Sequence, residues 1–372
     1  MKKLILFILT VFALQANAAI LTVNNAPNGG AQFTKINDAI AAANNGDIIY
    51  IHGSPDVYEG IIQNNKKLTF IGPGWSPNKN NPVRALIASI IARNTNQATA
   101  VNTVNGSEYI GLVINGEFRI SQNGGGDVSV NNIRIDRCEF RQDLLIQNAA
   151  SNYIIENCYK TGQIARILLT ESLSYSNFLI QNNIFRIDAF SNGFFNGFKN
   201  ISNVIINHNL FYTNAPGTTG SLMFTSECKG LLLTNNIFVN MNVGANLSFS
   251  TFNNNLTFYP NIAVLPGPWT INNNIDGGSS NLQNVNPGMV AQTAVNAGTD
   301  NPILDFSIAA GAANNAGTDG KDLGLLFDAT GNLNWNNARG ARIPFIFSMN
   351  IINPTVAPGA NLNVEVTAKK QN

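Results

Sequence analysis

Short stretches with alternating apolar and polar positions recur through the middle of the chain. Six copies share the order Asn, apolar, any residue, Ile, polar, Asn, Asn, apolar, Phe. They begin at Asn131, Ser151, Ser176, Ser202, Lys229 and Pro268, with looser copies from Tyr109 and Ser250. Within them, apolar side chains alternate at the period of a β-strand, as in Phe178 and Ile180. The intervals are filled with Asn, Ser and Gly, which predicts turns rather than helices.

The spacing of these copies predicts the architecture. We take the second Asn of each copy as a marker, which selects Gly116, Cys138, Cys158, Asn183, Asn209, Asn236, Asn255 and Asn274. Successive markers lie 22, 20, 25, 26, 27, 19 and 19 residues apart. A coil of about 23 residues that holds two or three short strands is the rung of a parallel β-helix. About ten such rungs fit between Ile48 and Ile275.

The marker column predicts a ladder of stacked side chains. Asn tolerates the left-handed backbone conformation that a sharp bend requires, and stacked Asn side chains can bond to the rungs above and below. The expected ladder residues are Asn183, Asn209, Asn236, Asn255 and Asn274. Next to them, a column of inward aromatic rings is expected from Phe118, Phe140, Phe185, Phe211 and Phe238, interrupted by Lys160.

The two ends of such a coil need covering because open strand edges promote aggregation. A helix from residue 34 to 43 is expected over the first rung, with Thr34 as its N-cap and Phe33, Ile36, Ile40 and Ala43 on its apolar face. Residues 341–372 predict strands broken by Pro354 and Pro358, which form either a C-terminal cap or a small appended β unit.

The first residues have the pattern of a secretory signal peptide. Lys2 and Lys3 precede an apolar run from 4 to 14, and Ala16-Asn17-Ala18 is a small-residue cleavage site. We expect cleavage after Ala18 and export to the periplasm, the cell surface or the medium. No later segment has the length of a transmembrane helix. The predicted organisation is a signal peptide over 1–18, a β-helix domain over 19–340 and the C-terminal tail or cap over 341–372.

Composition narrows the classes of function. The net charge of +1 provides no basic surface for nucleic acid, and 44% apolar residues argue against disorder. Only 12% of the residues are charged, whereas Asn alone provides roughly one residue in six. Two His and three Cys make a His-based triad and a disulfide scaffold unfavourable. Cys138 and Cys158 share the marker column, which leaves open a disulfide between rungs or two buried thiols.

The chain resembles right-handed parallel β-helix proteins of the pectin-lyase-like superfamily. The segment FTKINDAIAAANNGDIIYIHGSPDVYEG is similar to their N-terminal cap and first coil, and Asp322-Leu323-Gly324 stands where their closing segment ends the helix. The tail PGANLNVEVTAKK is similar to tails of exported, uncharacterised Bacteroidota members. The resemblance implies an all-β, right-handed parallel β-helix with an N-terminal capping helix and a C-terminal β cap. It does not specify an activity, because this fold hosts lyases, hydrolases, esterases, tailspikes and adhesins.

Catalytic motifs of these enzymes can be compared with the sequence. The Gly-His-Gly and Arg-Ile-Lys of polygalacturonase-like enzymes are missing, as are the Gly-x-x-Asp-Phe and Leu-Gly-Arg-Pro-Trp of methylesterase-like enzymes. The pattern of pectate-lyase-like enzymes, carboxylates that hold calcium beside a basic Arg or Lys, is diffuse and stays open as an alternative.

Charged side chains of the early rungs are the candidate ligand-binding residues. In the marker alignment, Arg119, Arg141 and Arg186 share one column. The full set is Arg119, Arg134, Asp136, Glu139, Arg141, Glu156, Tyr159 and Arg186. Such a ladder can grip an acidic polysaccharide through Arg–carboxylate contacts, or it can be a solvated surface of weak salt bridges. The sequence predicts no metal site and no cofactor, with calcium required only by the lyase alternative. We therefore expect a non-catalytic exported protein that binds polysaccharide or acts as a surface scaffold; the alternative is a polysaccharide lyase.

Overall fold

The computed structural model describes most of the chain beyond its first residues. The described residues are 18–27, 29–75, 83–121, 126–162, 166–188, 193–214, 220–278, 280–327, 335, 344–351, 361 and 363–370. The predicted signal peptide lies outside the described residues except for Ala18, and so do Pro354 and Pro358.

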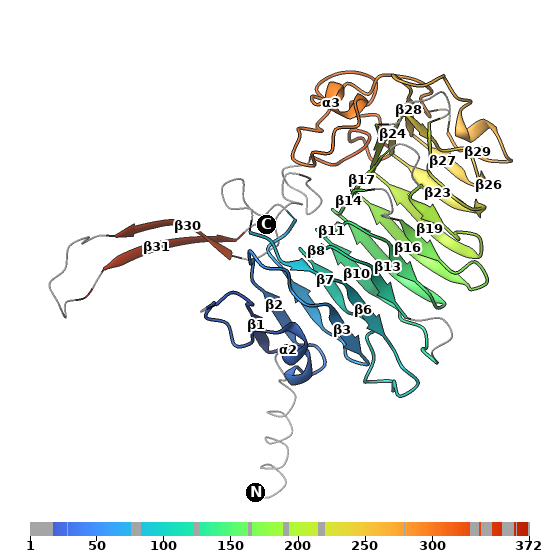
Figure 1. Cartoon of the computed structure of the whole chain (residues 1–372). Helices are drawn as coiled ribbons and strands as arrows, with labels where there is room; N and C mark the ends of the chain where they lie inside the picture. Colours follow the sequence, from blue (N-terminus) through green and yellow to red (C-terminus); the bar gives the residue numbers. More distant parts are fainter. Residues whose placement is uncertain are drawn as a thin grey trace, which may run out of the picture.

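Three parallel sheets run along the body of the molecule (Figure 1). Sheet A contains β1 (Ile20–Val23), β2 (Ile48–Ile51), β4 (Thr69–Ile71), β7 (Glu108–Ile110), β10 (Ile133–Asp136), β13 (Ala150–Glu156), β16 (Tyr175–Gln181), β19 (Ile201–Asn207), β23 (Leu231–Thr234), β27 (Thr251–Asn253) and β29 (Ile275–Asp276). Sheet B contains β5 (Leu86–Ile87), β8 (Val113–Ile114), β11 (Glu139–Phe140), β14 (Tyr159–Lys160), β17 (Ile184–Ile187), β20 (Leu210–Thr213), β24 (Ile237–Val239) and β28 (Leu256–Phe258). Sheet C contains β3 (Ile61–Asn64), β6 (Ile90–Arg93), β9 (Phe118–Ile120), β12 (Leu144–Ile146), β15 (Ile167–Leu169) and β18 (Phe195–Asn196).

The rungs from β4 to β18 visit the three sheets in the same order. The chain passes from β10 in sheet A to β11 in sheet B and β12 in sheet C, and then returns to β13 beside β10. The ten strands of sheet A from β2 to β29 enclose about nine turns of the coil, close to the expected ten rungs. The parallel pairing of successive rungs and the right-handed crossover make the fold a right-handed parallel β-helix, as predicted.

The interior is filled by the alternating apolar side chains of the strands. Along sheet B, aromatic rings stack in a column, with Phe185 and Phe211 4.7 Å apart and Phe211 and Phe238 5.2 Å apart between ring centroids. Lys160 occupies this column between Phe140 and Phe185, as the repeat alignment indicated. Phe118 does not belong to this column, because it lies in β9 of sheet C.

At the bend between sheets A and B, one residue makes the sharp turn of the backbone and the next residue bonds to the neighbouring rung. In seven successive rungs the first residue of this bend takes the left-handed conformation, and this column contains Gly111, Arg137, Asn157, Asn182, His208, Asn235 and Asn254. The marker itself turns inward and bonds to the next rung. Asn183 and Asn209 donate their backbone N–H to the Oδ1 of Asn209 and Asn236 at 2.9 and 3.0 Å. The bend backbone is thereby satisfied inside the coil.

The ladder continues through Asn255 to Asn281 rather than to Asn274. Asn255 donates its N–H to the Oδ1 of Asn281 at 2.8 Å, whereas the Oδ1 of Asn274 accepts the N–H of Ser250 at the start of a strand. The prediction for Asn274 is wrong because the 3₁₀ helix η1 (Pro268–Thr270) displaces this copy of the repeat, so that β29 follows Asn274 instead of preceding it.

The N-terminal helix α2 (Ile36–Ala42) covers the first rung. Its buried residues, Ile36, Ala39 and Ile40, form an apolar face of the kind that the sequence predicted, and the helix packs on β1, β2 and β3. The N-cap is Lys35 rather than Thr34, and its side chain makes no capping bond. The helix depends on burial of its apolar face more than on capping.

The far end of the coil is covered by the chain that follows the last rungs. Trp269 of η1 is buried and packs edge-on against Phe252 at 6.1 Å. The chain then returns along the outward face of sheet B. We call residues 289–327 the return segment, which includes α3 (Gln292–Asn296). Apolar side chains of this return segment, among them Val295 and Phe306, form a second core with outward residues of sheet B such as Tyr212.

Residues 344–370 contain an antiparallel hairpin of β30 (Pro344–Ile351) and β31 (Val364–Lys370). In Figure 1 this hairpin projects from the coil, so it is an appended unit and not a cap. Two further pairs of short strands extend the late rungs: β21 (Ser221–Leu222) with β25 (Met241–Asn242), and β22 (Cys228–Lys229) with β26 (Leu247–Ser248).

Candidate functional site

The eight side chains predicted to form one binding face lie in three separate places. Arg119 belongs to β9 in sheet C, where it pairs with Leu145, and its guanidinium contacts Glu117 at 2.6 Å. Its expected alignment with Arg141 is wrong, because Gly111 already makes the bend at a φ of 66° and shifts this copy of the repeat by four residues. A glycine at the bend carries no side-chain signal that could have corrected the alignment.

A second group lies where sheet A meets the bend. Arg134 contacts Glu156 at 2.6 Å and Asp136 at 3.2 Å, and Arg137 contacts Asp136 at 2.6 Å. Asn157 donates a further bond to Asp136 at 2.8 Å. Burial raises the pKa of Asp136, while the charges of Arg137 and Arg134 oppose that rise. These groups satisfy one another, so the network holds two rungs together and has little capacity for a ligand.

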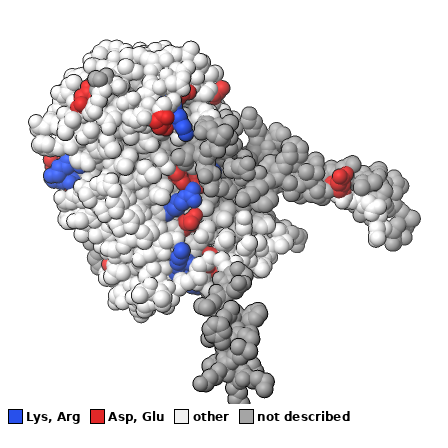
Figure 2. Space-filling model, turned by 180° about the vertical axis from the view of Figure 1, so that it is seen from behind, with Lys and Arg blue, Asp and Glu red and all other residues white. Residues whose placement is uncertain are grey.

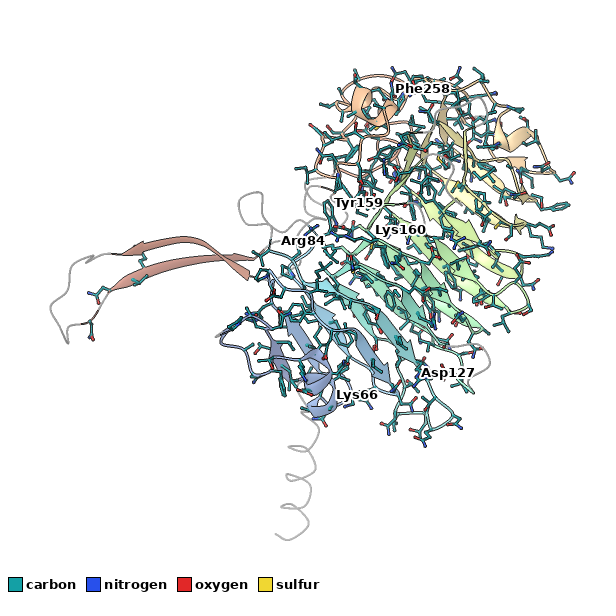
Figure 3. All side chains as sticks on the ribbon, viewed as in Figure 1. Lys66, Arg84, Asp127, Tyr159, Lys160 and Phe258 are labelled. Atoms are coloured by element: carbon teal, nitrogen blue, oxygen red, sulfur yellow. The ribbon has the colours of Figure 1, made fainter. Side chains whose placement is uncertain are left out.

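The third group lines an open hollow of about 360 Å³ on the outward side of sheet B. We call it the sheet B hollow; its lining residues are Arg84, Glu139, Arg141, Tyr159, Thr161, Gly162, Asp300 and Pro302. Figure 3 shows Arg84 and Tyr159 close together on this side of the coil. The hollow combines early rungs with the return segment, which lies more than a hundred residues further along the chain.

Two arginines converge on one carboxylate in this hollow. Glu139 contacts Arg84 at 3.0 Å and the Nε of Arg141 at 2.7 Å. The Glu139 side chain is only 7% exposed, whereas those of Arg84 and Arg141 are 36% and 32% exposed. Each guanidinium carries five N–H donors, so both retain donors for a second anion. The buried carboxylate fixes the two cations at one place on the surface.

Asp300 forms the opposite side of the hollow. It accepts hydrogen bonds from the hydroxyls of Tyr159 and Thr161, the latter at 2.9 Å. Burial raises the pKa of Asp300, the nearby charge of Glu139 adds to the rise and Arg141 opposes it. The hollow thus holds one carboxylate paired with two guanidinium groups and a second one whose pKa is raised by burial.

Arg186 is a structural member of this region rather than part of the open surface. Its Nε donates to the carbonyl of Gly298 at 3.1 Å, and its Nη2 contacts Asp188 at 2.6 Å. Its Nη1 lies 3.7 Å from Asp300. The side chain is largely buried and ties the return segment to sheet B.

An aromatic group lies behind Tyr159. The rings of Trp75 and Tyr159 are 5.9 Å apart, and those of Trp75 and Trp335 are 5.5 Å apart. Both tryptophans are buried, although they are 260 residues apart in the sequence. They support the floor of the sheet B hollow by packing.

Sequence reasoning missed Arg84, Asp300, Trp75 and Trp335. All four lie outside the aligned copies of the repeat, so no periodic signal marked them. Asp300 and Trp335 reach the site because the chain folds back over sheet B, whereas Trp75 and Arg84 come from the connection between β4 and β5. The residues that the repeat did mark, Glu139, Arg141 and Tyr159, are the ones that sheet B itself contributes.

Other chemistry-bearing residues are enclosed. Cys138, Cys158 and Cys228 are buried free thiols. His208 lies at the bend, where its ring nitrogens contact the carbonyl of Gly324 at 3.0 Å and Asp319 at 3.2 Å. Within the described ranges, no three His, Cys, Asp or Glu side chains group as a metal site would require.

The surface as a whole is sparsely charged. Figure 2 shows charged side chains of both signs next to one another in a narrow stripe, surrounded by neutral surface. Among the residues that the structure describes, no helix has the length and apolar character of a membrane span. The fold and this hollow define the class: a β-helix protein with a small charged site on its sheet B side.

The comparisons with known proteins do not identify a family or a function. No family model matches the chain, and no curated protein matches it either. Among solved structures, the pectin methylesterase from Aspergillus niger is similar, with 12% identity over 76% of this chain and 95% of that chain, and a TM-score of 0.35. At this level of similarity the match carries no argument about fold or activity.

Proposed function

We propose that the chain is an exported, non-catalytic protein that binds an acidic polysaccharide at the sheet B hollow. The observation that carries this proposal is the convergence of Arg84 and Arg141 on the buried Glu139, with both guanidinium groups still partly exposed. A sugar carboxylate can take the remaining N–H donors in a bidentate contact. Tyr159 and Thr161 offer hydroxyl oxygens for the sugar hydroxyls.

The arrangement favours recognition over chemistry. The carboxylate of Glu139, beside the two arginines, is already paired with both guanidinium groups. The hydroxyl of Tyr159 donates its hydrogen bond to Asp300. Arg84 and Arg141 lie side by side on Glu139, so two weak contacts to one polymer add through effective concentration. Binding of this kind is sensitive to salt because the charges lie at the surface.

A second candidate function is a polysaccharide lyase, which one observation favours. Arg141, Tyr159 and Asp300 meet in one hollow, whereas catalysis by residues spread along the coil would be excluded by distance. In this alternative a guanidinium binds the carboxylate of the sugar, and a neighbouring group accepts the proton α to it. A calcium ion would be required only for this alternative.

The test is a binding and activity panel with polygalacturonate, alginate and a neutral glucan. Arg141→Ala is expected to weaken binding of an acidic polysaccharide about tenfold, equivalent to about 1.4 kcal/mol. Arg119→Ala is the matched control, because Arg119 lies on sheet C and outside the hollow. Binding is measured by calorimetry at two salt concentrations.

The same samples are followed for absorbance of unsaturated products, with and without calcium. Binding without product supports the proposal. Formation of product that Arg141→Ala abolishes would replace it with the lyase. Equal effects of Arg141→Ala and Arg119→Ala, or no binding of either acidic polymer, would refute the assignment of the hollow.

A further inference from the structure

A column of left-handed residues follows one corner of sheet A, where the rungs from β10 onward enter the sheet. The strand pairing aligns its members, which are Asn132, Asn152, Asn177, Asn203, Gly230, Phe249 and Asn273. All of them have positive φ values. Six are Asn or Gly, the residues that tolerate this conformation, and the seventh is Phe249.

Phe249 is therefore strained at a position where the other rungs have relaxed residues. Its φ is 49°, and a bulky side chain in the left-handed region costs conformational free energy. Burial of the ring does not offset this cost, because Phe249 is 62% exposed. Strain of this kind concentrates at ligand sites, and an observed outlier is a reason to look for one.

The side chains of this column form an exposed ladder that stops beside Phe249. Asn152, Asn177 and Asn203 each donate from Nδ2 to the Oδ1 of the preceding rung, at 2.8, 2.9 and 2.8 Å. The next member is Gly230, and a Cβ placed there would meet no atom within 4 Å. Among the described residues, none donates a hydrogen bond to the Oδ1 of Asn203. The Oδ1 of Asn203 thus faces the position of Gly230, an empty step where the ladder has no side chain.

That empty step is part of a hollow of about 270 Å³. Ile205 and Leu232, outward residues of β19 and β23, line it together with Thr251. Asn203 and Phe249 lie on the rungs before and after the step at Gly230. The lining combines aliphatic carbons, one aromatic ring, one amide and one hydroxyl, and it contains no charged side chain.

We propose that this hollow, which we call the Phe249 hollow, binds a neutral sugar unit of a polysaccharide. A sugar ring presents C–H groups on its faces and hydroxyls around its edge. Its faces match Phe249 and the aliphatic residues, and its hydroxyls match the Oδ1 of Asn203 and the hydroxyl of Thr251. Ligand sites of this size are mostly apolar with a few placed polar groups.

The neighbouring surface continues the site along the coil axis. The adjacent outward column of sheet A carries an amide or hydroxyl on four successive rungs: Gln181, Asn207, Thr234 and Asn253. Rungs repeat at about 4.8 Å, which is close to the length of one sugar in an extended chain. The site lies on a different wall from the sheet B hollow and does not depend on the acidic ligand proposed there.

Two substitutions test the Phe249 hollow in opposite ways. Phe249→Asn restores the residue type of the neighbouring rungs, so it is expected to raise the midpoint of unfolding while it weakens sugar binding at least tenfold. Gly230→Asn continues the ladder into the empty step with a backbone that Asn tolerates, and it is expected to block binding without loss of stability. Ile154→Ala, on the same outward column but outside the hollow, is the control and keeps binding unchanged.

Binding is measured by NMR titration with hexasaccharides of β-linked glucose, xylose and mannose at millimolar concentrations. Arg141→Ala is included and is expected to bind neutral hexasaccharides like the wild type, which separates this site from the sheet B hollow. The proposal is overturned if none of the three hexasaccharides binds. It is equally overturned if Phe249→Asn lowers the midpoint of unfolding, since the ring is then structural, or if both substitutions leave binding intact.

Discussion

Early and late rungs of the coil use the same bend with different side chains. At the marker position, the early rungs place the thiols of Cys138 and Cys158, and the late rungs place the amides of a ladder that begins at Asn183. Cys158 still donates its backbone N–H to the Oδ1 of Asn183 at 2.8 Å. The left-handed residue before the marker is therefore the fixed requirement of the bend, whereas the marker side chain can vary.

The outward faces of the early and late rungs also carry different side chains. Along one column of sheet A, Arg134 is followed by Ile154, Leu179, Ile205 and Leu232. Charges on the early rungs are paired within the protein, and the late rungs present a neutral face with a hollow. The backbone repeats, but the chemistry that it presents is local to a few rungs.

The largest expected effect concerns the lysine inside the early rungs. Lys160 is fully buried, its Nζ lies 4.3 Å from the centre of the Phe140 ring, and no hydrogen-bond partner for it is found among the described residues. Burial lowers the pKa of Lys160 from 10.5 to about 7, against the opposing influence of Asp143. The folded protein thus releases this proton more readily than the unfolded chain.

Stability should consequently rise with pH between about 7 and 10.5, because the unfolded chain binds more protons in that window. For this shift the rise is roughly 5 kcal/mol, at 1.36 kcal/mol for each pKa unit. Lys160→Met is expected to remove the rise and to stabilise the protein at pH 7. Urea unfolding at several pH values measures it, with the surface variant Lys199→Met as a control that keeps the rise. If the free energy of unfolding of the wild type did not change with pH in this window, the lowered pKa of Lys160 would be contradicted.

A smaller loss is expected when the late-rung ladder is broken. Asn209 donates from Nδ2 to the carbonyl of Ile180 at 2.9 Å, and its Oδ1 accepts the N–H of Asn183 at 2.9 Å. Asn209→Leu leaves these buried groups unpaired and should cost about 1–3 kcal/mol of the free energy of unfolding. The exposed Asn177→Gly, which keeps the left-handed backbone without strain, is the comparison and should cost less. An unchanged midpoint for Asn209→Leu would mean that the ladder contributes no stability.

The smallest effect is expected when an early rung is converted to the late type. In Cys158→Asn the new Nδ2 can reach the carbonyl of Ile135, which the Cys158 thiol now approaches at 3.7 Å. The exchange of a buried thiol for a bonded amide should change stability by about 1 kcal/mol or less. Thermal unfolding monitored by circular dichroism measures the change. A loss comparable to that of Asn209→Leu would show that the early bend cannot hold an amide.

The alternation of apolar residues and the repeat were sufficient to predict the rungs, the aromatic column and most of the ladder. Errors arose where a copy of the repeat was displaced: Gly111 made a bend without an Asn, and η1 displaced the copy that contains Asn274. Because of such a shift, a residue such as Arg119 lies on a different sheet from the one that the alignment predicted. Register within a solenoid depends on the length of each turn, which a loose consensus does not report.

The sequence by itself determined the coil, because its strands pair with neighbouring rungs and every rung carries its own signal. Glu139, Arg141 and Tyr159 were identifiable for that reason. Only the tertiary structure decided that Arg84 and Asp300 join them, and that Gly230 leaves a space beside Phe249. Those sites depend on the return of the chain over sheet B and on alignment between rungs. Such contacts follow from the geometry of the whole fold and leave no periodic mark along the chain.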